Sequence, residues 1–155
     1  MEFFIKDMNE KSAVEIVNWK YDAPYDFYNN EVTSEAINEI IENPYFAIVN
    51  QFEELIGFFC IGSSAQVPIG HQYGAYSEEF LDIGIGMNPE LTGKGFGTIF
   101  FSTVLQHIEN DLPIRLTVAE FNQRAIRLYL KYGFIEKKKF KRGSTEFIVM
   151  VKGNE

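Results

Sequence analysis

The residues of this chain with the clearest chemical potential form a short glycine-rich turn: Thr92, Gly93, Lys94, Gly95, Phe96, Gly97 and Thr98. The turn follows an alternating run of residues and leads directly into a helical pattern. Glycines let the backbone approach a ligand closely, and the first turn of a helix carries N–H groups that lack partners within the helix. This combination predicts a binding site for an anion such as a phosphate group.

Two common phosphate-binding loops do not fit the turn. A P-loop requires a glycine five positions before Gly93 and a Ser or Thr after Lys94, but Asn88 and Gly95 stand there. A dinucleotide-binding fingerprint requires a third glycine at the position of Thr98, and it lies near the start of a βαβ unit. The turn therefore belongs to a different class of anion site.

The elements that must position this turn are a strand and a helix. Alternation predicts a strand from Leu81 to Met87, with Asp82, Gly84 and Gly86 on the face opposite the larger apolar residues. Pro89 cannot donate to a sheet, so the strand should end near Met87. The following helix is predicted from an apolar stripe formed by Phe96, Phe100, Val104, Leu105 and Ile108.

A second informative stretch runs from Leu116 to Phe134. Its pattern predicts a strand, then Asn122 as the N-cap of a helix of about three turns, and Gly133 as the left-handed residue that ends it. With Ala125 and Tyr129 at their spacings, this stretch resembles a conserved segment of the Gcn5-related N-acetyltransferase (GNAT) family.

The glycine-rich turn resembles the coenzyme A loop of the same family, whose pattern is Gln/Arg-x-x-Gly-x-Gly/Ala. Gly95 and Gly97 take the two small positions, and Thr92 stands where Gln or Arg is expected. That departure removes a side-chain contact but leaves the backbone amides. The resemblance spans Phe46 to about Val151.

The resemblance implies the GNAT fold, a mixed α/β fold whose mostly antiparallel sheet of six to seven strands is flanked by helices. It also implies acetyl-CoA as co-substrate, with a splayed strand pair at the coenzyme site and the diphosphate on the amides of the turn. One N–H of Ile85, Gly86 or Met87 should bind the acetyl oxygen. The implied coenzyme-binding residues are Ile85, Gly86, Met87, Thr92, Gly93, Lys94, Gly95, Phe96, Gly97, Thr98, Asn122 and Ala125.

Two residues are candidates for proton transfer. Tyr129 matches the family's acid that protonates the leaving thiolate, although a tyrosine on the apolar face of a helix is also typical of a protein core. Asp82 matches an acid that acts on the acceptor amine, and its alternative is a structural ion pair. Glu120, Glu79 and His71 are weaker candidates for the base. No group of residues has metal-ligand spacing, so no metal is expected.

The segment from Trp19 to Asn30 combines five aromatic residues with two acids. One interpretation is a loop that packs on the core through its aromatic rings. The other is a wall of the acceptor site, because aromatic faces and carboxylates hold cations. The candidate acceptor-binding residues are Trp19, Tyr21, Tyr25, Asp26 and Tyr28.

Charge narrows the class of acceptor. The chain has 155 residues, 46 % of them hydrophobic, and a net charge of −8. Residues 1–60 hold twelve acids against three lysines, which favours a cationic acceptor and argues against nucleic acid. We expect one acetyltransferase domain over residues 1–155, no membrane span, and the cytoplasm as the default location. The sequence is also compatible with a homodimer.

The sequence therefore predicts an acetyl-CoA-dependent N-acetyltransferase. A primary amine, on a cationic small molecule or a peptide N-terminus, should attack directly in a ternary complex. A non-catalytic acyl-CoA-binding or regulatory domain of the same fold is the alternative, and O-acetyl or longer-acyl transfer also stays open. The glycine-containing stretch Gly62–Ser77 should be a long loop that is functional or mobile.

Overall fold

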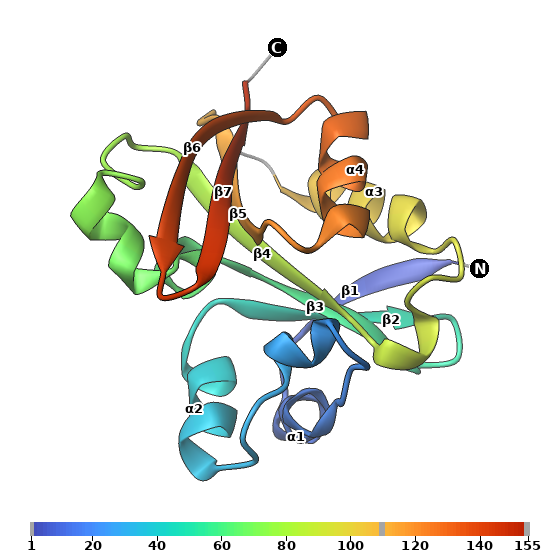
Figure 1. Cartoon of the computed structure of the whole chain (residues 1–155). Helices are drawn as coiled ribbons and strands as arrows, with labels where there is room; N and C mark the ends of the chain where they lie inside the picture. Colours follow the sequence, from blue (N-terminus) through green and yellow to red (C-terminus); the bar gives the residue numbers. More distant parts are fainter. Residues whose placement is uncertain (1, 109–110, 154–155) are drawn as a thin grey trace. The chain divides into compact units, whose positions relative to one another are not determined.

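The structure is a computed structural model that describes residues 2–108 and 111–153 (Figure 1). None of the helices in those residues is long and apolar enough to cross a membrane. The strands and α-helices follow one another as β1 (Phe3–Asp7), α1 (Glu10–Asn18), α2 (Ser34–Glu42), β2 (Tyr45–Asn50), β3 (Leu55–Ile61), β4 (Leu81–Met87), α3 (Gly97–His107), β5 (Ile114–Ala119), α4 (Gln123–Lys131), β6 (Ile135–Arg142) and β7 (Thr145–Lys152).

The residues group into two compact units, and strand β4 contributes to both. Unit 1 comprises Met1–Cys60 and Ile85–Glu109, and unit 2 comprises Ile61–Gly84 and Asn110–Glu155. Neither unit is one continuous stretch of chain, so the division does not test the prediction of a single domain. The hydrogen-bonded order of the strands is β1-β2-β3-β4-β5-β7-β6.

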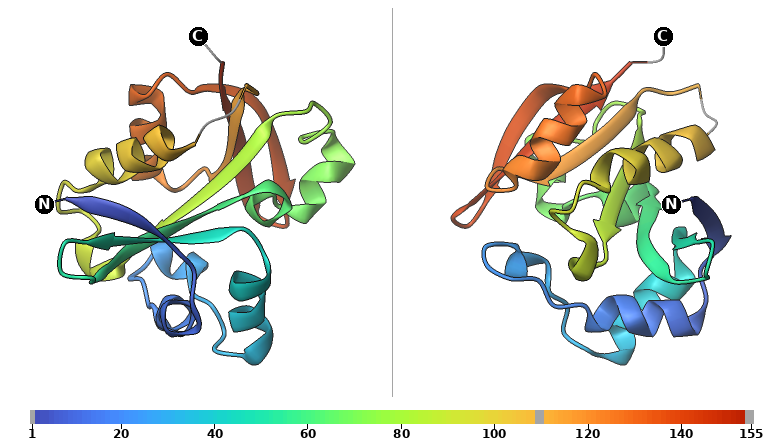
Figure 2. Two further views of the ribbon diagram at one scale, coloured as in Figure 1. Left: turned by 180° about the vertical axis from the view of Figure 1, so that it is seen from behind. Right: turned by 90° about the vertical axis from the view of Figure 1, so that its right-hand side faces the viewer.

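Unit 1 is built on the antiparallel strands β1, β2 and β3. The end of β4 is tied to β3, because the amide of Asn88 donates to the carbonyl of Ile56 at 2.8 Å. Helices α1 and α2 lie on one side of these strands and α3 lies on the other (Figure 2). Alternation along β3 explains this, since Phe58 stacks on Trp19 after α1 while neighbouring Gly57 faces Phe100 of α3.

Unit 2 is built on the first half of β4 and the strands β5, β7 and β6. The register of β4 with β5 is parallel and covers Leu81↔Ile114 and Asp82↔Arg115. Strand β7 pairs antiparallel with both β5 and β6. A buried cluster holds this unit together, and its members are Ala75, Tyr76, Ala119, Phe140, Phe147 and Val149.

These pairings confirm the predicted mixed, mostly antiparallel sheet, and the predicted strand from Leu81 to Met87 is observed with the same bounds. One expectation was incomplete. The stretch Gly62–Ser77 contains two short 3₁₀ helices, η2 (Gly62–Ala65) and η3 (Pro68–Tyr73), instead of an irregular loop. It is ordered because Val67, Ile69 and Tyr76 pack into the buried cluster of unit 2.

Two glycines allow β3 and β4 to approach closely within unit 1. A Cβ atom at Gly57 would lie 2.5 Å from the carbonyl oxygen of Gly86 and would also overlap the ring of Phe100. A Cβ atom at Gly86 would overlap the ring of Phe58. The residues beside the end of β4 are thus packed without room for a further methyl group.

We expect the substitution Gly57→Ala to lower the free energy of unfolding by about 1–3 kcal/mol, the usual range for overpacking a core. Urea unfolding followed by circular dichroism measures the change. Gly153→Ala is the matched control, because a Cβ atom there meets nothing within 4 Å. Equal stability of the two variants would contradict the close packing of β3 and β4.

Candidate functional site

The glycine-rich turn of unit 1 ends at a helix whose N-terminus has no side-chain cap. Helices α1, α2 and α4 are capped by the side chains of Asn9, Thr33 and Asn122. Residue Phe96 precedes α3, and it provides no capping hydrogen bond. Among the α-helices of the described residues, α3 is therefore the one without a side-chain cap, and the positive partial charge of a helix N-terminus favours an anionic ligand.

The backbone of the turn has the conformation that glycine permits. Gly93 and Gly95 have φ angles of +73° and +85°, and a Cβ atom at Gly95 would meet nothing within 4 Å. Residues Gly93, Lys94 and Gly95 are exposed. The turn therefore presents bare backbone to solvent, which suits the approach of a phosphate group.

The side chains beside these amides are held by the protein itself. The hydroxyl of Thr92 donates to the carbonyl of Pro89 at 2.9 Å, so this side chain closes the short 3₁₀ helix η4 (Pro89–Leu91). The ring of Phe96 packs against Phe3 with a centroid distance of 6.5 Å. The backbone amide of Thr92 also donates to the carbonyl of Pro89, at 3.4 Å, so of these two residues it is Phe96 whose backbone amide would contact an anion.

Strand β4 has backbone beyond the positions paired with β5. That register covers Leu81 and Asp82, and Ile83 and Gly84 of unit 2 already lie past it. The last three residues, Ile85, Gly86 and Met87, are partly exposed. On its other side β4 has β3 as its hydrogen-bonded neighbour. The splayed strand pair that the family resemblance implies stays a prediction.

Aromatic residues surround the end of β4 within unit 1. The hydroxyl of Tyr21 donates to the carbonyl of Met87 at 2.7 Å. Trp19 is buried and stacks on Phe58, with 6.2 Å between the centroids, and the ring of Tyr45 lies 5.8 Å from the same Phe58 ring. Burial raises the pKa of Tyr21 to about 12. Burial, followed by the neighbouring Cys60 thiol and Glu39 carboxylate, raises the pKa of Tyr45.

The predicted acceptor segment is therefore divided. Trp19 and Tyr21 are packed beside β4, whereas Tyr25, Asp26 and Tyr28 lie on the 3₁₀ helix η1 (Tyr25–Tyr28), with Asp26 and Tyr28 exposed. Phe58 and Tyr45 belong to the same aromatic group, but the sequence analysis did not select them. They lie on β2 and β3, and a single sequence does not say which face of a strand lies beside Trp19.

Helix α4 places its predicted residues in unit 2. The side chain of Asn122 accepts from the amide of Ala125 at 3.2 Å, which confirms the predicted N-cap. Tyr129 is 5 % exposed, and its ring lies 6.1 Å from that of Phe134. Gly133 has a φ angle of +89° and ends the helix as predicted.

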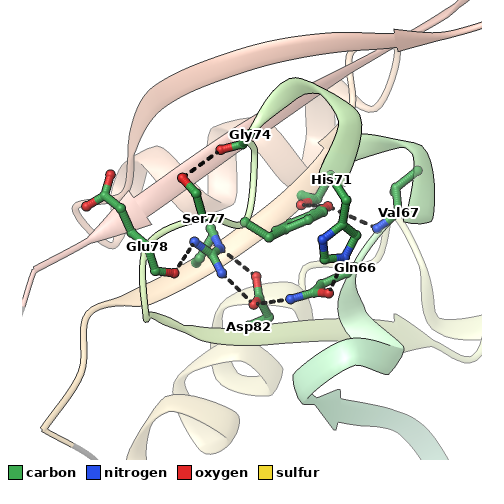
Figure 3. A network of polar contacts seen from close by, with 10 residues as sticks. Gln66, Val67, His71, Gly74, Ser77, Glu78 and Asp82 are labelled. Carbon is green, nitrogen blue, oxygen red and sulfur yellow. Dashed lines mark hydrogen bonds and ion pairs between the residues drawn. The ribbon is translucent and has the colours of Figure 1, made fainter.

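Asp82 forms a buried ion pair, which disfavours the predicted role of base. Its two carboxylate oxygens accept from Nε and Nη2 of Arg115 at 2.7 and 2.8 Å, and both residues are almost fully buried. Gln66 also donates to Asp82, at 2.9 Å. Two donors of Arg115 and one of Gln66 already bind its two oxygens (Figure 3), so a proton from an amine would have to displace one of them.

The weaker candidates for the base lie in different surroundings. Glu120 and Glu146 share a hydrogen bond that raises the pKa of Glu120 and lowers that of Glu146. Glu79 is exposed. His71 bonds to Gln66 through Nε2 at 2.9 Å and so joins the group around Asp82. In the described residues no cluster of His, Cys, Asp and Glu has the composition of a metal site.

Comparison with known proteins agrees with this architecture. The family described as "Acetyltransferase (GNAT) family" matches residues 11–134. The chain therefore belongs to the GNAT acetyltransferase family and is an acyltransferase, as its motifs predict. No curated protein matches the sequence.

Solved structures show the same fold. A chimera of the spermidine N-acetyltransferase SpeG from Vibrio cholerae and hSSAT superposes with a TM-score of 0.69 at 22 % identity, covering 97 % of this chain and 95 % of that one. The aminoglycoside acetyltransferase AAC(6')-Ib in complex with coenzyme A gives 0.72 at 17 % identity, covering 98 % and 95 %. A putative acetyltransferase from Acinetobacter baylyi gives 0.66 at 18 % identity, covering 99 % and 93 %.

The raised pKa of Tyr21 predicts how stability changes at alkaline pH. An unfolded tyrosine titrates near 10, so the stability that Tyr21 contributes is complete below pH 10 and is lost as the pH rises towards 12. Between pH 10 and 11, we expect unfolding free energy to fall by about 1 kcal/mol more in the wild type than in Tyr21→Phe. Urea titrations at the two pH values measure this difference.

Tyr73→Phe is the control for that experiment, because it makes the same chemical change at a tyrosine that is 47 % exposed. Its alkaline loss of stability should equal that of the wild type. If the unfolding free energy of Tyr21→Phe fell with pH as steeply as that of the wild type, the burial of the Tyr21 hydroxyl would be contradicted.

Proposed function

We propose that this chain transfers the acetyl group of acetyl-CoA to a primary amine on a cationic small molecule or a peptide N-terminus. The observation that carries the proposal is the uncapped N-terminus of α3 behind the exposed glycine turn at the end of β4. Membership of the acetyltransferase family favours this enzyme over the non-catalytic alternative.

The backbone amides from Gly93 to Thr98 would hold the diphosphate of the coenzyme. Positive partial charge at the helix N-terminus and the positive φ angles of the two glycines both favour an anion there. The acetyl oxygen would receive an N–H from Ile85, Gly86 or Met87, at the partly exposed end of β4. An N–H aimed at the developing negative charge typically contributes about 3 kcal/mol to a reaction of this type.

Charge and aromatic packing support a cationic acceptor. Unit 1 holds fourteen acids against four lysines, whereas unit 2 holds eight acids against ten Lys and Arg residues. The field of unit 1 therefore attracts cations. Trp19, Tyr45 and Phe58 add aromatic rings, whose faces bind ammonium groups. The solved neighbours include a spermidine N-acetyltransferase and an aminoglycoside acetyltransferase, and both of these named compounds carry several amino groups.

Direct transfer needs few groups, because a thioester is already activated. The amine nitrogen attacks the carbonyl carbon, the C–N bond forms, and the C–S bond breaks as its electron pair leaves with sulfur. We assign the protonation of the leaving thiolate to Tyr129, a buried tyrosine at the position that the family uses for this acid. The amine must also lose a proton, and the ion pair of Asp82 with Arg115 calls for another acceptor.

A panel of amines tests the proposal. Purified chain is incubated with acetyl-CoA and polyamines, aminoglycosides, amino acids, N-terminal peptides and neutral alcohols, and free coenzyme A thiol is measured. We expect release with cationic primary amines and none with alcohols. If the chain acetylated only neutral or anionic acceptors, the charge argument would be contradicted. If it bound the coenzyme but acetylated no acceptor, the proposed acetyltransferase activity would be contradicted.

The substitution Tyr129→Phe should lower kcat by about 10²-fold or more, the usual contribution of a positioned acid. The affinity for coenzyme A, measured by calorimetry, should stay within about twofold, because the ring that packs on Phe134 is retained. Tyr132→Phe at the end of the same helix is the matched control and should keep kcat. Full activity of Tyr129→Phe would show that another group protonates the leaving thiolate.

The substitution Gly95→Ala tests the turn. Gly95 and Gly143 both have positive φ angles, and a Cβ atom at either meets nothing within 4 Å. Alanine at each position should therefore cost a similar stability, about 1 kcal/mol. We expect the dissociation constant of coenzyme A to rise at least tenfold for Gly95→Ala only. Equal affinities of the two variants would show that the turn does not hold the coenzyme.

A further inference from the structure

Asn88, the first residue after β4, is hydrogen-bonded to β3 and to η4 within unit 1. Its amide donates to the carbonyl of Ile56 at 2.8 Å, and its Nδ2 donates to the carbonyl of Leu55 at 3.1 Å. Its Oδ1 accepts from the amide of Glu90 at 3.0 Å, and its carbonyl accepts from the amide of Leu91 at 2.9 Å. This half-buried residue therefore joins a strand of the sheet to the segment that precedes the glycine-rich turn.

A β-bulge in β3 explains how one residue binds two successive carbonyls. Successive carbonyls of a regular strand point to opposite edges, so only one of the two would face β4. In the register of β2 with β3, two successive residues of β2 face Gly57 and Leu55, so Ile56 is the extra residue of β3. A bulge re-aims the groups of the strand that carries it, and bulges are common next to active sites. The irregularity of β3 therefore lies at the residues that bind Asn88.

The orientation of the Asn88 side-chain amide is determined by its partners. A carbonyl oxygen only accepts, so the NH₂ group must face Leu55, and a backbone N–H only donates, so Oδ1 must face Glu90. Both halves of the side chain are therefore in use. A serine at this position would keep an oxygen that accepts from Glu90 but would have no second arm to reach Leu55.

Asn88 lies between the two backbone segments that the proposed function assigns to the coenzyme. Before it, the carbonyl of Met87, the last residue of β4, accepts from the hydroxyl of Tyr21 at 2.7 Å. After it, Pro89–Leu91 form η4, and the exposed turn begins at Gly93. A shift of Asn88 would therefore move the end of β4, the turn, or both.

We infer that Asn88 is a positioning residue for the acetyl transfer, an inference that rests on the proposed function. Through Nδ2 it holds the end of β4 against β3 and so places the N–H that would receive the acetyl oxygen. Through Oδ1 it starts η4 and so places the turn that would hold the diphosphate. Displacing a donor by about 1 Å from the developing negative charge can cost about 10²-fold in rate. Asn88 therefore acts on the reaction through the backbone on both of its sides.

Two substitutions separate these effects, assayed with an amine that the wild-type chain acetylates. Asn88→Ser keeps the cap of η4 and removes the bond to Leu55, so kcat should fall about tenfold or more while the dissociation constant of coenzyme A stays within about twofold. Asn88→Ala removes both bonds, so we expect the same loss of kcat and also a rise of about tenfold in that dissociation constant. Steady-state kinetics and calorimetry measure the two quantities. Equal coenzyme A affinities of the two variants would contradict the role of Oδ1.

Asn50→Ala is the matched control for general destabilisation. Asn50 also belongs to unit 1 and is buried, and its Oδ1 accepts from the amides of Phe52 and Glu54 in the turn between β2 and β3. This variant should lower the urea midpoint of unfolding at least as much as Asn88→Ala but keep kcat and coenzyme A affinity.

The kinetic outcomes distinguish the inference from the proposed function. If Asn88→Ala kept both wild-type values, or if Asn50→Ala lost them equally, the inference would be overturned while the proposed function stands. If the wild type bound coenzyme A and acetylated no amine, both would be refuted.

Amide hydrogen exchange gives a second test that needs no substrate. In ¹⁵N-labelled protein, the amide of residue 88, which donates to Ile56, should exchange at least severalfold faster in Asn88→Ser than in the wild type, because the supporting bond to Leu55 is lost. The amide of Glu90 should keep its wild-type protection in Asn88→Ser and lose it in Asn88→Ala. Wild-type exchange at both positions in Asn88→Ala would show that the side chain positions neither segment, and the inference would be overturned.

Discussion

The buried ion pair between Asp82 and Arg115 is the interaction on which unit 2 depends most. A carboxylate and a guanidinium cannot be buried at an acceptable cost unless each satisfies the other, and breaking such a pair typically costs about 3–5 kcal/mol. Here both carboxylate oxygens are bound, and the guanidinium lies over the rings of Tyr76 and Phe80. The pair joins β4 to β5 at the second of their two paired positions.

The place of this pair on β4 has a functional consequence. The strand is anchored at Asp82, and five residues later it ends at Met87 beside a turn of bare backbone. The register with β5 covers Leu81 and Asp82, and the other hydrogen-bonded neighbour of β4 is β3. One strand thus combines a rigid start with a polar, partly exposed end, and this suits a site that must hold an extended carrier.

In unit 1, aromatic rings pack beside the end of β4. Gly57 and Gly86 bring β3 and β4 together, and Phe58 covers the Gly86 backbone. Stacking then orders Trp19 and Tyr45 around Phe58. Acids outnumber lysines in unit 1, which attracts cations, and the faces of aromatic rings attract cations through their quadrupole.

Much of this could be predicted from the sequence, because the signals involved are local. Period-2 alternation placed β4 from Leu81 to Met87, and Asn122 and Gly133 marked both ends of α4, as the structure confirms. The glycine turn was predicted from its glycines between a strand and a helix pattern, and Gly93 and Gly95 have the positive φ angles that glycine allows. The family followed from these two motifs in their order along the chain.

The tertiary structure decided the partners of each side chain, which depend on residues far apart in the sequence. Asp82 meets Arg115 only because β4 and β5 pair in one register. The carboxylate that the sequence predicted as a base is therefore held in an ion pair. Phe58 meets Trp19 only through packing across a strand. Local sequence determines backbone conformation over a few residues, whereas hydrogen-bond partners and proton-transfer roles depend on register and packing, which bring distant residues together.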